Sequence, residues 1–231
     1  MSSVSNAFLS EQEVMIRESA RRVAEEVVAV TMGPDSAVRA LHKAVALGAD
    51  RSVHLSDAAL TGSDVCATGY SLAKVLESES PDLVLLGQQS DDGECYTIGA
   101  VVADHLQMPS LTQVIKIDVN DGKLRCERQA EYGYDTVEIE LPAVISVGDA
   151  INEPRYPSLK AIMGAKKKPL DNKGAGDVGI DAAQVGEAGS KTKVLALNPP
   201  PAKEAGEIIE DEDTNETVEK IVAWLDERKL I

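Results

Sequence analysis

The stretch LPAVISVGDAINEPRYPSLKAIMGAKKK, residues 141–168, decides how the rest of the chain is interpreted. It opens with a short run of apolar and β-branched residues, which is typical of a buried strand. The prolines at 154 and 157 then fix φ twice and hold their neighbours extended, so no helix runs through 152–157. Ser158 is a candidate N-cap for a short helix that begins at Leu159 and leads into Lys166, Lys167 and Lys168. We interpret the segment as a docking element that presents Leu159 beside positive charge.

Upstream of this segment, helical and strand patterns alternate. Apolar residues recur at helical spacing over 8–26, 35–47 and 64–79, and short apolar or β-branched runs occupy 27–32, 51–55 and 82–86. This alternation indicates a parallel, doubly wound sheet. Three alternating runs at 111–119, 123–130 and 134–141 predict an antiparallel excursion from it.

The C-terminal part of the chain reads as an arm. Residues 171–189 are rich in Gly, Asp and Ala, which predicts loop and linker with at most a short helix. Three prolines and the acidic run 210–213 form a stiff and then solvated connector. Thr214 to Lys229 carries an apolar stripe at helical spacing that includes Trp224. We predict an α/β domain over 1–190, and an extended linker with a C-terminal helical arm over 191–231.

Charge and cysteine usage exclude several classes of function. The chain of 231 residues has 23 Lys and Arg against 39 Asp and Glu, and its net charge of −16 argues against partners such as nucleic acid or anionic membranes. No apolar run approaches the ~20 residues that span a bilayer, and the acidic N-terminal residues fit neither a signal nor a transit peptide. Cys66, Cys95 and Cys126 form no CxxC pair, so neither a disulfide framework nor a zinc site is indicated. We expect a cytoplasmic protein.

The order of a strand, N-E-P-R-Y-P at 152–157 and then L-x-x-I-M-x-A-K-K-K resembles the electron transfer flavoprotein β subunits. The likeness continues upstream through DLVLLGQQSDDGE at 82–94 and KLRCERQAEYGYDTVEIELPAV at 123–144. Downstream it includes DNKGAGDVGID at 171–181, so it covers nearly the whole chain. GADRSVHLSD at 48–57 and PPPAKEAG at 199–206 are similar to actinobacterial-type members. The resemblance implies a doubly wound, adenine nucleotide α-hydrolase-like fold.

Members of that family have a first strand and a hairpin-like loop before the position matched here by Asn6-Ala7-Phe8, and this chain lacks them. Because that strand lies centrally in the family's sheet, we expect its absence to leave two neighbouring strands without hydrogen-bond partners. Either the start codon is misassigned or the chain is impaired. The regular patterning elsewhere favours the first explanation.

The loop from Gly87 to Thr97 follows a predicted buried strand and precedes a predicted helix at 98–106, where open α/β sheets bind ligands. Backbone amides at the helix start suit a phosphate. Without a GxGxxG or P-loop pattern, an ordinary exposed turn is the stronger interpretation from the residues alone, and Asp91, Asp92 and Glu94 would repel a phosphate. The resemblance implies AMP here, or a second FAD in bifurcating members. It assigns nucleotide contacts to Ser90, Asp92, Gly93, Tyr96, Thr97 and Ile98. Tyr96 and Ile98 depart from the polar residues common at these positions in the family.

The resemblance also assigns roles outside this loop. Asn6 is expected to touch the nucleotide, Phe8 to approach the flavin edge and Met32 to give a backbone contact. Taken alone, Phe8 is an apolar residue of a helix face. Leu159 resembles the leucine that the family inserts into partner dehydrogenases. From the residue type alone, a leucine in a short helix is more often a core contact.

The lysine run and Trp224 complete the predicted sites, and the histidines lie outside them. The lysines 166–168 would steer acidic partners, or else form a solvated charge run, and Gly164 stands where the family often has lysine. Trp224 is expected to contact the α subunit. His42, His54 and His105 are scattered, and we expect them to be structural, because no Ser-His-Asp or Cys-His arrangement can be argued.

The leading hypothesis is the β subunit of a heterodimeric electron carrier and not an enzyme. It would pass electrons from acyl-CoA or other flavin dehydrogenases toward a quinone oxidoreductase, through FAD shared with the α subunit. The alternative is a stand-alone adenine-nucleotide-binding regulatory domain of the universal-stress type. That class shares the doubly wound sheet but lacks the N-E-P-R-Y-P and lysine-run segment.

Overall fold

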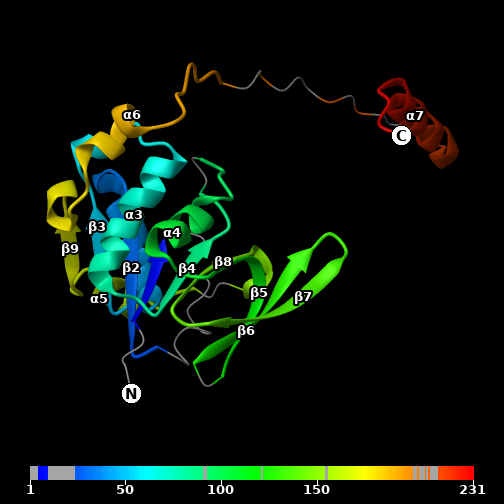
Figure 1. Cartoon of the computed structure of the whole chain (residues 1–231). Coiled ribbons are helices and arrows are strands. Elements are labelled where there is room, and N and C mark those ends of the chain that lie inside the picture. The colour runs from blue at the N-terminus through cyan, green and yellow to red at the C-terminus, as the bar shows by residue number, and fades with distance from the viewer. Residues whose placement is uncertain are drawn as a thin grey trace. The chain divides into compact units, whose positions relative to one another are not determined.

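The computed structural model describes residues 24–90, 93–120, 122–153, 156–199, 202, 206, 208 and 213–231, together with the backbone of 5–9. The chain forms two compact units, Met1–Lys193 and Val194–Ile231 (Figure 1).

The first unit is built on one nine-stranded sheet with the order β7-β6-β5-β8-β4-β1-β2-β3-β9 (Figure 1). Neighbours from β5 across to β9 run parallel, whereas β6 and β7 run antiparallel. This bears out the predicted α/β fold around a mainly parallel sheet with an antiparallel excursion. The strands are β1 (Ser5–Leu9), β2 (Glu26–Met32), β3 (Arg51–Leu55), β4 (Leu83–Gly87), β5 (Ser110–Asn120), β6 (Lys123–Ala130), β7 (Gly133–Glu140), β8 (Ala143–Val147) and β9 (Leu170–Lys173).

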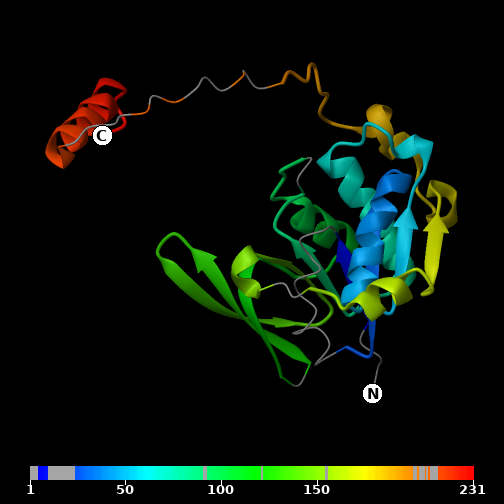
Figure 2. The ribbon, with the colours of Figure 1, turned by 180° about the vertical axis from the view of Figure 1, so that it is seen from behind.

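Helices cover both faces of this sheet (Figure 2). They are α2 (Val38–Leu47), α3 (Val65–Glu79), α4 (Ile98–Leu106), α5 (Leu159–Ala165) and the short α6 (Gly186–Gly189). Alternate residues of each strand face opposite sides. Thus Val27 and Ala29 join the core that contains α2 and α5, while Val28 and Val30 join the core that contains α3 and α4. The helices predicted over 35–47, 64–79 and 98–106 are confirmed, the first with a 3₁₀ turn at Asp35–Ala37.

The antiparallel strands have one ionic and one apolar face. Lys116 pairs with Glu127 at 2.8 Å and Lys123 with Glu140 at 2.9 Å across the ladder. On the other face Leu124 and Cys126 are buried. Burial raises the pKa of the Cys126 thiol to about 11, so this cysteine behaves as a small apolar side chain.

The predicted helix over 8–26 is wrong at both ends. The backbone of Ser5–Leu9 forms β1, which pairs in parallel with β2 on one side and β4 on the other. Glu26 begins β2, and residues 10–23 lie outside the described ones. The expectation that two central strands lack hydrogen-bond partners is likewise wrong, because β1 lies between β2 and β4. A five-residue strand is set by pairing with residues ~20 and ~80 positions away, which local periodicity does not report.

The prediction of loop over 171–189 also needs correction. Residues 171–173 belong to β9, which pairs in parallel with β3 at the edge of the sheet. Its sequence Leu-Asp-Asn-Lys has one apolar residue, because an edge strand of a sheet is only partly covered. Beyond it the chain makes short 3₁₀ turns at Ala175–Val178 and Ala182–Gln184 and reaches α6.

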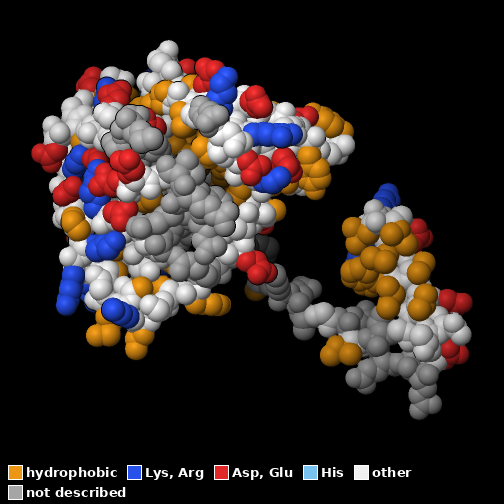
Figure 3. Space-filling view, turned by 90° about the horizontal axis from the view of Figure 1, so that it is seen from below, with side chains coloured by type: hydrophobic (Ala, Val, Ile, Leu, Met, Phe, Trp, Pro, Cys, Tyr) orange, Lys and Arg blue, Asp and Glu red, His pale blue; other side chains and the backbone are white. Residues whose placement is uncertain are grey.

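The second unit contains α7 (Thr214–Glu227), which confirms the predicted terminal helix. The Asp213 carboxylate caps it by accepting a hydrogen bond of 2.8 Å from the Asn215 N–H. Hydrophobic side chains gather along one side of this helix (Figure 3), and none of its residues is buried. Across the described residues, every helix is too short or too polar to cross a bilayer.

Candidate functional site

The carboxyl edge of the sheet has a switch point between β1 and β4. From β1 the chain builds β2 and β3 on one side, and it then returns through α3 to place β4 on the other side. In open α/β sheets the crevice outside this switch point is where ligands bind. The loop that follows β4 therefore lies where the sequence predicts a nucleotide site.

This loop runs from Gln88 to Thr97 and brings five of the predicted positions together. Ser90, Gly93, Tyr96 and Thr97 are exposed on it, whereas Ile98 begins α4 and packs against the core. The loop closes on itself through a 2.9 Å hydrogen bond from the Glu94 N–H to the Ser90 carbonyl. Asp92, the sixth predicted position, lies outside the described residues.

Within the part of the chain that the structure describes, Gln89 has a buried side-chain oxygen that accepts no hydrogen bond. A buried acceptor without a donor is costly, about 1–3 kcal/mol, and is rare in native proteins. Gln89 follows β4 by two residues, so its unpaired oxygen lies at the start of the loop at the switch point. No pattern in the sequence marks this residue, because Gln88-Gln89 reads as an ordinary polar turn.

The start of α4 lies beside the same loop and lacks a side-chain cap. Thr97 occupies the N-cap position with helical φ and ψ, and its hydroxyl makes no capping hydrogen bond. The first N–H groups of a helix need acceptors from elsewhere. Gly69 of α3 fixes the distance between the two helices, since a Cβ there would lie 2.5 Å from Val101 Cγ1.

The remaining cofactor positions lie on other strands. Met32 is the last residue of β2 and is partly buried against the core. Asn6 and Phe8 lie within β1, where Asn6 is in register with Val27 and Leu83, and Phe8 with Ala29 and Leu85. Their side chains lie outside the described part of the structure.

Two carboxylates in the connection between β3 and α3 are used internally. Asp57 accepts hydrogen bonds from the Ala59 and Ala175 N–H groups, and these bonds lower its pKa. Burial alone would raise the pKa of Asp64, but the N–H groups of Ala67, Thr192 and Lys191 outweigh it and lower the pKa. Asp64 thus joins the start of α3 to the point where the chain leaves the first unit.

The buried histidine also serves the fold. His54 has Nε2 2.9 Å from the Gly33 carbonyl and Nδ1 3.3 Å from Asn172 Oδ1. These contacts tie β3 to the end of β2 and to β9. His105 packs edge-on against the Tyr70 ring at 5.5 Å.

Helix α5 has the predicted cap and exposes the predicted leucine. The Ser158 hydroxyl accepts a 3.2 Å hydrogen bond from the Ala161 N–H. Leu159 is 74% exposed, and Ile162 and Met163 are exposed as well. Ala165 is buried in the core on the α2 side, which holds the helix against the sheet. The competing interpretation of Leu159 as a core residue is therefore wrong for this chain.

The three lysines after α5 differ from one another. Lys168 Nζ donates to the Ala49 carbonyl at 3.0 Å and lies 3.8 Å from Asp50 Oδ1, just beyond the end of α2. The Lys166 and Lys167 side chains form no ion pair within the described residues. Trp224, the last predicted contact, lies on α7 in the second unit beneath the Arg228 guanidinium at 4.0 Å.

These features define an open α/β protein with a switch point between β1 and β4 and a short helix that exposes apolar side chains. A family model described as the electron transfer flavoprotein domain matches residues 13–177. An electron transfer flavoprotein subunit β from Mycobacterium tuberculosis strain H37Rv is 42% identical over 220 residues, which cover 95% of this chain and 82% of that protein. The chain therefore belongs to the electron transfer flavoprotein β subunits.

Two more distant relatives extend this finding. The subunit β from Thermoanaerobacterium thermosaccharolyticum is 36% identical over 96% of this chain and 84% of its own length. A protein named caffeyl-CoA reductase-Etf complex subunit CarD, from Acetobacterium woodii, is 37% identical over 89% of this chain and 79% of its own. Electron transport is the function that these similarities support.

Proposed function

We propose that the protein passes electrons from flavin dehydrogenases toward a quinone oxidoreductase, as one half of a heterodimer with an electron transfer flavoprotein α subunit. The observation that carries this proposal is Leu159, a large apolar side chain held in solvent on a capped helix beside lysines. A regulatory domain of the universal-stress type would have no use for such a helix. The reductase complex in the name of one relative supports a partner of the flavoenzyme class.

FAD shared with the α subunit would supply the redox chemistry, since it accepts and releases electrons singly. This chain would cover part of the ring, with Phe8 near the flavin edge. An electron carrier has to hold its flavin near the partner's redox group and keep solvent away from it. The α5 surface would bind the partner and so bring the two groups together.

AMP is the nucleotide that we propose for the loop after β4. The residues present fit it in two ways. The unpaired Gln89 oxygen would accept a hydrogen bond from a ribose hydroxyl or the adenine amino group. The uncapped N-terminus of α4 would receive the phosphate. The Asp92 carboxylate would accept a hydrogen bond from a ribose hydroxyl. This arrangement would suit an adenine nucleotide α-hydrolase-like fold.

Releasing the nucleotides from the purified heterodimer tests the proposal directly. The two chains are co-expressed, denatured together and separated from their ligands, and FAD and AMP are quantified by chromatography. One FAD and one AMP per heterodimer agree with the proposal. Two FAD molecules would place the protein with bifurcating members, and a colourless homodimer would favour the regulatory alternative.

A pair of neighbouring variants tests the role of Gln89. Gln89→Leu removes the unpaired oxygen at similar size, so it should lower AMP content while FAD content stays the same. Gln88→Leu is the matched control one residue earlier and should retain AMP. Equal AMP content in both variants would remove Gln89 from the site.

A further inference from the structure

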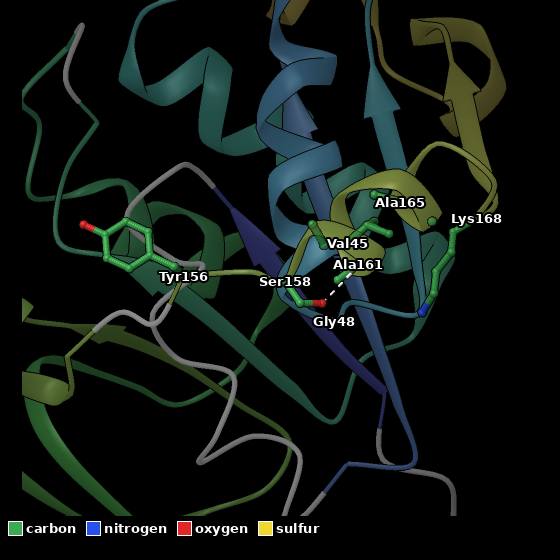
Figure 4. A pocket seen from close by; sticks show the side chains of 9 residues that line it. Val45, Gly48, Tyr156, Ser158, Ala161, Ala165 and Lys168 are labelled. Carbon is green, nitrogen blue, oxygen red and sulfur yellow. Dashed lines mark hydrogen bonds between the residues drawn. The ribbon is translucent and has the colours of Figure 1, made fainter.

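A pocket of about 410 Å³ lies between α2 and α5. Small residues form two of its walls: Val45, Ala46 and Gly48 come from the end of α2, and Ala161 and Ala165 come from α5. Figure 4 shows Ser158 and Lys168 at opposite sides of it, with the Ser158 hydroxyl turned toward Ala161. Because glycine and alanine leave the space empty, the pocket has room for the side chain of another molecule.

The two helices that frame this pocket form a basic surface on an acidic protein. The chain has a net charge of −16, yet 38–48 and 156–168 contain no Asp or Glu. They contain Arg39 and Lys43 on α2 and four lysines in the second segment. Helical spacing places Arg39 and Lys43 on the same side of α2 as the pocket residue Ala46. A complementary partner surface would therefore be acidic.

Lys168 brings one positive charge into the pocket wall. Its ammonium group has three N–H donors, of which one points to the Ala49 carbonyl at 3.0 Å. The ion pair with Asp50 is loose at 3.8 Å, and the other carboxylate oxygen of Asp50 accepts from the Val27 N–H at 3.0 Å. An incoming carboxylate could thus bind Lys168 without displacing its contact with the helix end.

We propose that this pocket receives an acidic side chain of the flavin dehydrogenase that docks on Leu159. The inference rests on the proposed function and adds a second point of contact to it. Leu159 projects outward, and Ala161, two residues later, lines the pocket, so one short helix would both insert a side chain and receive one. Methylene groups of a glutamate would pack on Val45 and Ala165, and its carboxylate would meet Lys168.

Two lysine variants distinguish a lysine that contacts the partner directly from one that only attracts the partner at a distance. Lys168→Met and Lys167→Met each remove one positive charge, but only Lys168 lines the pocket. The heterodimer is reduced by an acyl-CoA dehydrogenase that has itself been reduced by its substrate, and association and dissociation rates are measured over a range of salt. A contacting charge acts on dissociation and a rim charge on association. We expect roughly tenfold faster dissociation for Lys168→Met and a salt-dependent loss of association for Lys167→Met.

A third variant tests the pocket without changing any charge. Ala161→Met fills the space from the α5 side and should weaken docking even if Lys168→Met is poorly folded. Ala183→Met, on an exposed turn away from this surface, is the control and should bind as the unaltered protein does. Flavin content and melting temperature are recorded for every variant.

The outcomes distinguish the pocket from the proposed function. If Ala161→Met docks normally and both lysine variants behave alike, while Leu159→Ala still weakens docking, the pocket inference is wrong and the dehydrogenase partner stands. If Leu159→Ala also docks normally, the proposed function fails with it.

Discussion

Two helices of this protein expose apolar side chains, but they are held in different ways. Helix α5 has seven residues and is fixed by the Ser158 cap and by Ala165, which is buried on the α2 side. Helix α7 has fourteen residues in a unit of its own, and none of them is buried. Short helices are marginal without tertiary packing, so α5 depends on its platform while α7 depends on its length and caps.

The difference suggests two kinds of partner. The surface of α5 is small, preformed and basic, which suits repeated and brief contacts. The stripe on α7 contains Val218, Ile221, Val222 and Trp224, all exposed. Such a continuous apolar stripe needs a lasting cover in water. We expect α7 to bind the α subunit and α5 to bind the dehydrogenases.

The largest effect should come from removing Thr214–Ile231. Burial of four large apolar side chains at ~1.5–3 kcal/mol each would supply most of a stable association. Size-exclusion profiles of the co-expressed chains should therefore change from a heterodimer to separate subunits. In the full chain, Val222→Ser should weaken the complex and Glu219→Ser, on the same helix, should not. An intact heterodimer after the deletion would show that α7 has another role.

Leu159→Ala should slow electron transfer from a dehydrogenase by roughly ten- to hundredfold, because a buried leucine contributes ~1.5–3 kcal/mol. Flavin content and melting temperature should stay the same. Leu86→Ala is the instructive contrast, since Leu86 is 1% exposed in the core of β4 and its loss should lower the melting temperature. If the two variants behave alike, α5 is part of the core and not a docking surface.

Much of this comparison could be predicted from the sequence. Ser158 before Leu159 is a local signal, and its cap forms, whereas Asp213, assigned to the acidic connector, caps α7 as well. The strand at 143–147 is fully buried, as its apolar run indicates. Local chemistry sufficed wherever a cap, a turn or a periodic face determines the element.

The failures have a common physical cause, which is pairing between distant residues. β1 is a strand because β2 and β4 flank it, and β9 is one because β3 offers an edge. Lys168 reads as part of a solvated run, yet it bonds to Ala49, 119 residues away. The Gln89 oxygen and the pocket between α2 and α5 also exist only after folding.

The first unit should lose stability in acid through Glu79 of α3. Its side chain is 7% exposed and binds Arg51 at 2.6 Å and Lys173 at 2.7 Å, which fastens β9 and α3 together. Burial alone would raise the pKa of Glu79, but Lys173 and Arg51 outweigh it and lower the pKa below 4.5. A lowered folded pKa means that this contribution is present above the unfolded pKa and is lost as pH falls through the folded one.

Glu79→Gln should therefore destabilise the first unit by about 1–3 kcal/mol at neutral pH and flatten its stability profile below about pH 5. Denaturant titrations at several pH values measure both. Glu77→Gln is the control on the same helix, because its pair with Lys74 is exposed and should contribute little. Identical pH profiles for the two variants would contradict this account.

The smallest effects should come from removing the two helix caps. These variants would show whether α5 and α7 have separate functions. Ser158→Ala and Asp213→Ala each remove one capping acceptor, at a cost of about 1 kcal/mol to the helix concerned. We expect Ser158→Ala to weaken dehydrogenase docking a few-fold while the heterodimer stays intact, because only α5 loosens. Asp213→Ala should weaken association with the α subunit by a similar factor and leave docking unchanged within assembled heterodimers. Docking rates and subunit dissociation constants measured on both variants test the assignment, and a variant that affects both quantities equally would mean that the two helices do not act separately.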